Sequence, residues 1–141
     1  MNIFLFLRKD REFSECFSAV VEALNPHVGL EYYRSVERLA DRLRQPGASP
    51  SLGVLVAATR KELADLLMIH ELIWEEKVIV VLPDRDPATV FEGHFLRPRF
   101  VTFIDRDPTD VAAVLSKMLE LQVLARSLKL EPDSSTARLG P

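Results

Sequence analysis

The tetrapeptide Asp-Arg-Asp-Pro occurs twice in this sequence, at residues 84–87 and again at 105–108. Each copy follows an apolar run and precedes a segment with helical spacing, which places both copies where a predicted strand ends. Carboxylates gathered at one edge of a sheet could hold a divalent cation or act as general acid and base. The candidate metal ligands are therefore Asp84, Asp86, Asp105 and Asp107.

Helix capping explains the same residues without any catalytic chemistry. Aspartate is a favoured N-cap residue, and proline is favoured at the first helical position. Asp86-Pro87 and Asp107-Pro108 both have this order. A capping carboxylate already accepts hydrogen bonds from backbone amides, and no histidine or basic residue stands at a fixed spacing that would complete a catalytic site. The pattern favours two helix starts, so we predict no metal and no catalytic residue here.

Two adjacent cations, Arg8 and Lys9, follow the first apolar run. At the end of a strand they could bind an anion, such as a nucleotide phosphate, together with the N-terminus of a helix. No glycine-rich phosphate-binding loop accompanies them. Solvated cations that face the aspartates are the simpler interpretation, and an anion site at Arg8 and Lys9 is the alternative hypothesis.

The three histidines and the single cysteine are scattered along the chain, which argues against a zinc site. His70 falls on the apolar face of the segment 59–76, where we expect a buried imidazole that hydrogen-bonds a backbone carbonyl. Cys16 lies on the apolar face of the first predicted helix and should pack in the core. His27 and His94 have no partner at the spacing of metal ligands. The sequence therefore predicts no cofactor.

Five short apolar runs alternate with segments of helical period, which is the pattern of a parallel sheet with helices on both faces. The predicted strands are 2–7, 28–33, 52–58, 77–82 and 99–104, and the predicted helices are 10–24, 35–43, 59–76, 88–94 and 108–130. Right-handed crossovers and the edge character of the second run favour the order 2-1-3-4-5. We therefore predict an α/β fold, a single three-layer domain with a five-stranded parallel sheet and a long C-terminal helix.

The third predicted helix opens with the capping-box sequence Thr59 to Glu62. In such a box the Thr59 hydroxyl accepts from the Glu62 amide, and the Glu62 carboxylate accepts from the Thr59 amide. The box follows the third strand directly, so the loop between strand and helix is short.

The last predicted helix carries two apolar stripes. The first is expected to cover the sheet and contains Val111, Val114, Leu115, Met118 and Leu119. The second is shifted around the helix and contains Leu121, Leu124 and Leu128. A helix over 108–130 would be about 35 Å long, more than a sheet of this size needs. Its second half could pair with a second copy of the chain, and packing within the same domain is the alternative.

The overall composition narrows the classes of partner. The chain has 141 residues, 48% of them hydrophobic and 28% charged, and a net charge of −3. This balance gives no reason to expect a nucleic acid or an anionic membrane as partner. A single cysteine and the lack of a long apolar run lead us to expect a cytoplasmic protein. We expect one domain over residues 1–130 and a polar, disordered tail over 131–141.

Residues 1–130 resemble the receiver domains of bacterial two-component response regulators. The resemblance rests on the fivefold strand–helix pattern, the length and two local sequences. One is PSLGVLV, from Pro50 to Val56, which leads into the third strand. The other is DPTDV, from Asp107 to Val111, which opens the last helix. The resemblance implies a flavodoxin-like fold with acidic residues after the first strand for Mg²⁺ and a phosphate-accepting aspartate at the end of the third strand.

The residues that would carry receiver chemistry are missing. The chain has Leu7 and Arg8 after the first strand, Val56-Ala57-Ala58 at the end of the third, Leu82-Pro83 in place of the serine or threonine after the fourth, and Ile104-Asp105 in place of Lys-Pro after the fifth. Aspartyl phosphorylation needs an accepting carboxylate, a bound Mg²⁺ and a cation for the phosphoryl oxygens. The resemblance therefore implies a degenerate receiver, or pseudo-receiver, that does not take phosphate.

Three hypotheses of function follow from these observations. The first is a non-phosphorylatable, non-enzymatic signalling domain that contacts a second copy of itself, a sensor kinase or an output protein. The second is a flavodoxin-like domain that binds a small ligand or nucleotide through Arg8 and Lys9. The third is a metal-dependent enzyme that uses the four aspartates.

Overall fold

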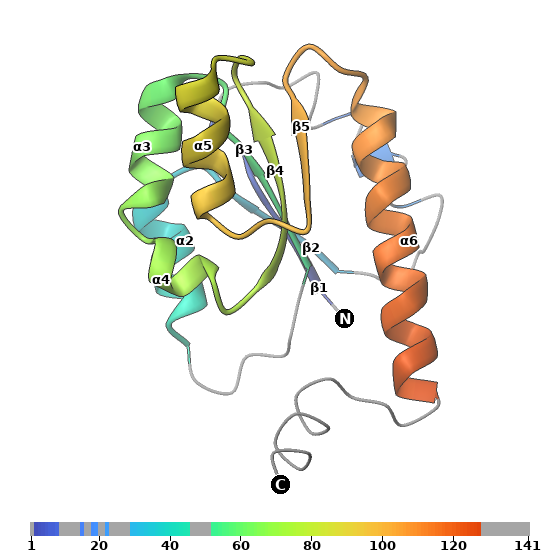
Figure 1. Ribbon diagram of the computed structural model, residues 1–141. Helices are drawn as coiled ribbons and strands as arrows, with labels where there is room; N and C mark the ends of the chain where they lie inside the picture. Colours follow the sequence, from blue (N-terminus) through green and yellow to red (C-terminus); the bar gives the residue numbers. More distant parts are fainter. Residues whose placement is uncertain are drawn as a thin grey trace, which may run out of the picture.

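The computed structural model describes residues 2–8, 15, 18–19, 22, 29–45 and 52–127. Its five strands form one parallel sheet in the order β2-β1-β3-β4-β5 (Figure 1). Their bounds are Asn2–Phe6 for β1, Gly29–Tyr33 for β2, Leu52–Val56 for β3, Lys77–Leu82 for β4 and Phe100–Phe103 for β5. The predicted strand order and the predicted edge position of the second strand are both confirmed.

The helices cover both faces of this sheet. Figure 1 shows α2 to α5 on one face and α6 on the other. Their bounds are Val36–Leu43 for α2, Arg60–Leu67 for α3, His70–Ile73 for α4, Pro87–Phe95 for α5 and Pro108–Ser127 for α6. The three-layer α/β architecture and the long C-terminal helix are therefore confirmed. Most of the predicted helix 10–24, including Cys16, and the predicted tail 131–141 lie outside the described residues.

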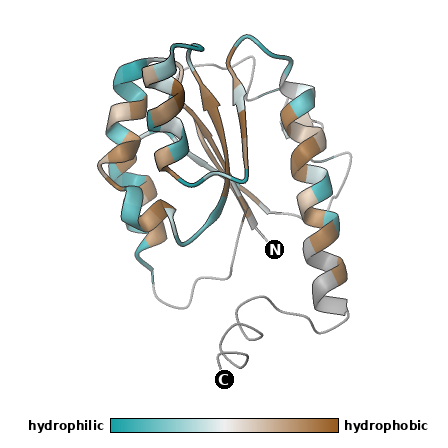
Figure 2. Ribbon diagram, viewed as in Figure 1, coloured by the Kyte–Doolittle hydropathy of each residue, from teal (hydrophilic) through white to brown (hydrophobic). Residues whose placement is uncertain are grey.

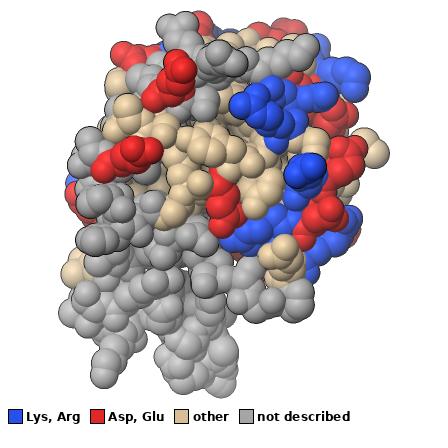
Figure 3. Space-filling view, turned by 180° about the vertical axis from the view of Figure 1, so that it is seen from behind, with Lys and Arg blue, Asp and Glu red and all other residues tan. Residues whose placement is uncertain are grey.

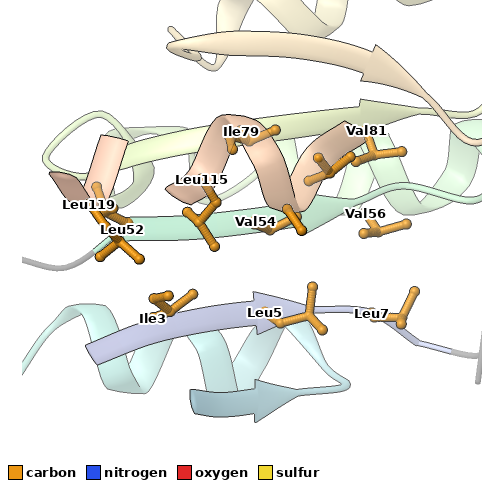
Figure 4. Packing of buried hydrophobic residues seen from close by; sticks show 12 residues of the cluster. Ile3, Leu5, Leu7, Leu52, Val54, Val56, Ile79, Val81, Leu115 and Leu119 are labelled. Atoms are coloured by element: carbon orange, nitrogen blue, oxygen red, sulfur yellow. The ribbon is translucent and has the colours of Figure 1, made fainter. Parts of the chain in front are cut away.

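The face of the sheet under α6 is covered with aliphatic side chains. In Figure 4 the strand residues of this cluster lie against α6. The cluster contains Ile3, Leu5, Leu7, Leu52, Val54, Val56, Ile79 and Val81 from the strands and their extensions, and Val111, Ala112, Leu115 and Leu119 from α6. Because successive side chains of a strand point to opposite faces, every second strand residue belongs to this cluster.

The opposite face of the sheet packs against α2 to α5. Its cluster includes Phe4 and Phe6 of β1, with Leu39 from α2 and Leu63 and Leu66 from α3. In Figure 2 the strands are mostly hydrophobic, while the helices alternate between hydrophobic and hydrophilic residues. Strands that are apolar on both sides are typical of a parallel sheet that is covered on both faces.

Gly53 of β3 marks the tightest contact in this second cluster. A Cβ atom at this position would lie 2.1 Å from Cζ of Phe4 on the neighbouring strand. The aromatic ring of Phe4 therefore lies directly on the backbone of β3, and only glycine leaves room for it. A large residue on β1 thus packs against a small residue on β3, which keeps this face of the sheet closely packed.

The single helix predicted over 59–76 is wrong, because the structure breaks it into α3 and α4. Met68 and Ile69 form the break, and Ile69 has φ −114° and ψ 26°. The amide of Ile69 donates to the carbonyl of Leu66 at 3.1 Å, which is a tighter turn than that of an α-helix. The break leaves His70 half-buried and Ile73 fully buried, so the chain avoids placing an imidazole at the centre of an apolar face.

Candidate functional site

Arg8 follows β1 and turns toward α3. Its Nη1 lies 3.4 Å from Oδ2 of Asp65, and the Nζ of Lys61 lies 3.7 Å from the same carboxylate oxygen. One carboxylate thus balances part of the charge of two cations. Lys9, the second residue of the predicted anion site, lies outside the described residues. Arg8 is therefore engaged in an ion pair with Asp65, and an anion site shared by Arg8 and Lys9 stays a prediction.

A groove of about 560 Å³ runs between α2 and α3 beside Arg8. It is lined by Arg8, Ser35, Val36, Glu37, Ala40, Asp41, Arg44, Lys61, Asp65, Met68 and Ile69. Seen from behind in Figure 3, positive and negative side chains lie next to one another on the side of the molecule that carries α2 and α3. The groove therefore offers charges of both signs rather than a field of one sign.

The end of β3 is apolar and closed. Ala57 is fully buried, and its amide donates to the carbonyl of Val81 at 2.9 Å. The amide of Ala58 donates to Oε1 of Glu62 at 2.9 Å, while the amide of Glu62 donates to Oγ1 of Thr59 at 3.2 Å. The predicted capping box is therefore present with one correction, since Glu62 reaches the amide of Ala58 and not that of Thr59. Side chains of the chain itself occupy the amides that an anion would need.

The first Asp-Arg-Asp-Pro copy is a turn held by Asp84. Oδ1 of Asp84 accepts a hydrogen bond from the amide of Asp86 at 3.0 Å. The hydroxyl of buried Thr89 and this amide lower the pKa of Asp84, although no hydrogen bond of ordinary geometry joins the Thr89 and Asp84 side chains. Asp86 stands at the N-cap position of α5 without a capping hydrogen bond from its side chain, and its Oδ2 lies 3.9 Å from Nη1 of Arg60. The prediction that Asp86 caps this helix through its carboxylate is wrong, because this carboxylate lies beside Arg60 and accepts no hydrogen bond from an amide of the first turn.

The second copy begins α6 as predicted. Oδ1 of Asp107 accepts from the amide of Thr109 at 3.0 Å, which lowers the pKa of Asp107. Oδ2 of Asp105 lies 2.6 Å from Nη1 of Arg85, and this hydrogen bond lowers the pKa of Asp105. The guanidinium of Arg85 also lies over the ring of Phe103, 4.3 Å from its centroid. Asp105 of the second tetrapeptide is therefore paired with Arg85 of the first tetrapeptide.

The four aspartates do not combine into a site with free carboxylates. Each one accepts a backbone hydrogen bond or lies beside an arginine. The pKa values of Asp84, Asp105 and Asp107 are lowered, whereas a carboxyl group that serves as a general acid at neutral pH needs a raised pKa. Within the described part of the chain, no three histidine, cysteine, aspartate or glutamate residues are grouped so that they could hold a metal ion.

His70 forms the hydrogen bond to a backbone carbonyl that the sequence predicts. Its Nδ1 lies 2.8 Å from the carbonyl oxygen of Leu67. The side chain is half-buried rather than buried, and its ring contacts Trp74 and Phe95. His94 is exposed near the end of α5, and His27 lies outside the described residues.

The two apolar stripes of α6 differ in burial. Val111, Leu115 and Leu119 are buried against the sheet, and Val114 and Met118 are half-buried at the edge of the same cluster. In the second stripe, the exposed fractions of Leu121 and Leu124 are 60% and 54%. Leu128 lies outside the described residues. The second stripe is therefore free to meet another protein, and its role as an interface stays a prediction.

One cluster was missed by the sequence analysis. It joins His70 and Trp74 at α4 to Phe95 at the end of α5 and to Arg97 beyond it. No local sequence pattern predicts this cluster, because Trp74 and Phe95 stand more than 20 residues apart in the chain. In the structure Arg97 follows Leu96, the C-cap of α5, at a position where glycine is usual, but the predicted helix 88–94 ended too early to reveal this.

Comparison with known proteins does not add a relative. No family model, no curated protein and no solved structure matches this chain. Among the described helices, none is long and apolar enough to cross a membrane. The functional proposal therefore depends on the fold, the carboxyl ends of the strands and the exposed side chains.

Proposed function

We propose that this chain is a receiver-like signalling domain that is not phosphorylated and that works through contacts with other proteins. The strand order β2-β1-β3-β4-β5 supports a receiver-like fold. The observation that carries the rest is the end of β3, where Ala57 is buried and Glu62 holds the amide of Ala58. A phosphate-accepting domain needs a carboxylate nucleophile at this point and room for the phosphoryl group beside it.

The neighbouring strands do not supply the missing groups. Arg8 stands where a receiver has Mg²⁺-binding carboxylates, and it is paired with Asp65. The carboxylates that follow β4 and β5 already have partners. Asp84 accepts from the amide of Asp86 in a turn, and Asp105 accepts from Arg85. A Mg²⁺ ion would have to displace these partners before it could organise a phosphoryl transfer.

Acetyl phosphate tests this proposal directly. The purified chain is incubated with acetyl phosphate and Mg²⁺, next to a phosphorylatable receiver as a positive control, and its intact mass is measured. We expect no species heavier by about 80 Da, the mass of one phosphoryl group. A stable adduct of that mass, mapped to the carboxyl ends of the strands, would show that the proposal is wrong.

Binding of a small anion is the second candidate function, and the groove beside Arg8 favours it. The groove places Arg8, Lys61 and Arg44 around an open volume of about 560 Å³. A thermal-shift series with phosphate, nucleotides, Mg²⁺ and Mn²⁺ separates the hypotheses, since a ligand that binds only the folded state raises the melting temperature. A rise with anions favours the groove, a rise with cations favours a metal site at the aspartates, and no rise favours protein contacts.

A further inference from the structure

Trp74 forms a fixed aromatic platform where α4 meets α5. Its Nε1 donates to the carbonyl of Phe95 at 2.8 Å. The ring centroid of Trp74 lies 4.6 Å from that of His70 and 5.5 Å from that of Phe95. His70 is itself held by the carbonyl of Leu67. The indole therefore has one orientation, set by contacts from both helices.

Arg97 lies on this platform in a backbone conformation that disfavours it. The centre of its guanidinium is 3.7 Å from the centroid of the Trp74 ring. Its φ is 56°, the only positive value for a residue other than glycine in the described part of the chain. It follows Leu96, the C-cap of α5, at a position where glycine is strongly favoured. An arginine side chain is thus present against the preference of the backbone, and such outliers often mark functional positions.

The guanidinium of Arg97 has no carboxylate partner within the described residues. Seven ion pairs are formed there, and neither Arg97 nor the nearby Arg99 takes part in any of them. Both residues are exposed. Stacking on Trp74 orients the guanidinium plane, and its N–H groups donate no side-chain hydrogen bond to any other described residue. The surface is therefore ready to receive a carboxylate from outside the domain.

Two phenylalanines extend this surface along α5. Phe91 and Phe95 stand four residues apart and so lie on the same side of the helix. Their exposed fractions are 74% and 46%. Gly93, on the opposite side of the helix, is buried and faces Leu82 of β4, so the phenylalanines lie on the side of α5 that is turned away from the sheet. An exposed aromatic pair beside an unpaired arginine is typical of a contact surface.

We propose that Trp74, Phe91, Phe95 and Arg97 form a docking surface for a peptide segment of a partner protein. Charge complementarity defines the peptide, because Arg97 and Arg99, which form no ion pair with another described residue, would attract carboxylates. Arg97 would bind an aspartate or glutamate with its planar fork, and an adjacent aliphatic or aromatic side chain would cover Phe91 and Phe95. This inference rests on the proposed function and names the chemistry of the partner.

A displayed library of random 12-residue peptides tests the proposal. The full chain is immobilised, peptides are selected against it, and the most enriched one is synthesised and its affinity is measured by fluorescence polarisation. We expect enriched peptides to combine acidic residues with leucine or an aromatic residue. The variants Arg97→Gly and Phe91→Ser should each weaken binding by about tenfold or more, as loss of a central interface contact does. Glycine suits the positive φ at position 97, so Arg97→Gly should keep the fold.

Matched variants separate docking from general surface effects. Arg106→Gln removes an exposed arginine at another place, and Met68→Ser removes an apolar side chain that is 81% exposed. Both should bind the peptide like the wild type, and thermal unfolding should show every variant folded. A selection without enrichment, or equal binding to Arg97→Gly and the wild type, would overturn the proposal. A phosphorylated species with acetyl phosphate would instead count against the proposed function and leave the docking surface in place.

Discussion

Single residues at the ends of the strands decide what this domain can do. Ala57 is buried at the end of β3, Glu62 accepts a hydrogen bond from the amide of Ala58, and Arg85 pairs with Asp105. Together these contacts pair the polar groups at the carboxyl ends of the strands with one another. An unsatisfied buried group would be costly, so this mutual pairing stabilises the fold while it closes the site.

The contact between Gly53 and Phe4 yields the first prediction. Gly53→Ala should lower the free energy of unfolding by about 1–3 kcal/mol, because the added methyl group would overlap the Phe4 ring and force it out of place. Denaturant unfolding measures the change. Combining Gly53→Ala with Phe4→Leu should cost less than the sum of the two single changes, since the smaller side chain makes room. Strict additivity would contradict this account of the contact.

The ion pair of Asp105 with Arg85 yields a prediction about pH. The pKa of Asp105 is lowered from the ordinary value of 3.8 by its hydrogen bond with Arg85. A carboxyl group with a lowered folded pKa stabilises the fold above its unfolded pKa and loses that contribution as the pH falls through the folded pKa. Asp105→Asn should therefore lower the melting temperature slightly at pH 7, and this difference should shrink as the pH falls below the ordinary pKa of 3.8. The effect is small because both side chains are exposed.

Asp110→Asn is the control for this prediction. Asp110 is exposed, and its Oδ2 lies 3.8 Å from Nε of Arg106, a longer contact than the 2.6 Å between Asp105 and Arg85. Its substitution should change the melting temperature less than Asp105→Asn at pH 7. An equal loss of melting temperature in both variants would mean that the short contact with Arg85 stabilises the fold no more than the longer contact with Arg106.

At the scale of elements, the sheet could be predicted and the helix–helix junctions could not. Apolar runs and crossover rules were sufficient for the strands and their order, because burial on both faces leaves a local signature. The break at Met68 and Ile69 contains neither glycine nor proline, and it depends on how His70 and Ile73 pack. The stacking of Arg97 on Trp74 joins residues that are distant in sequence. Contacts of this kind are decided by tertiary packing and leave no periodic pattern.

The two copies of Asp-Arg-Asp-Pro show the same limit. Sequence alone predicted one capping device used twice, and the structure has two different arrangements. Asp107 caps α6, whereas Asp84 holds the turn before α5 and leaves Asp86 beside Arg60. In the first copy the first aspartate accepts the backbone hydrogen bond, and in the second copy the second aspartate does, so identical local sequences are used differently.

The cap of α3 yields a prediction at this scale. Glu62→Ala should lower the free energy of unfolding by about 1–2 kcal/mol, since it removes the acceptor for the Ala58 amide and empties a buried position. Glu37→Ala, in the first turn of α2, is the control because Glu37 is exposed and should change stability by less than about 0.5 kcal/mol. Thermal or denaturant unfolding measures the change in stability of each variant. Equal effects would show that Glu62 acts as a surface charge and not as a cap.

At the scale of the whole molecule, the two candidate contact surfaces lie on opposite layers. The exposed leucines belong to α6, which covers one face of the sheet, and the docking surface belongs to α4 and α5 on the other face (Figure 1). A second copy bound to α6 would therefore leave Trp74, Phe91 and Arg97 accessible. Such a dimer would present two docking surfaces, and a partner with two acidic segments would bind it with increased avidity.

This arrangement predicts a dimer that depends on α6 and not on α5. Leu121 and Leu124 stand three residues apart on a helix of 20 residues, about 30 Å long, and both are more than half exposed. Light scattering after gel filtration should show a dimer for the wild type and a monomer for the double variant Leu121→Glu, Leu124→Glu, because buried charges would oppose pairing. The variants Phe91→Ser and Met68→Glu should remain dimeric, since they change the other layer. A wild-type chain that stays monomeric at high concentration would rule out the α6 dimer and would leave peptide docking to a single copy.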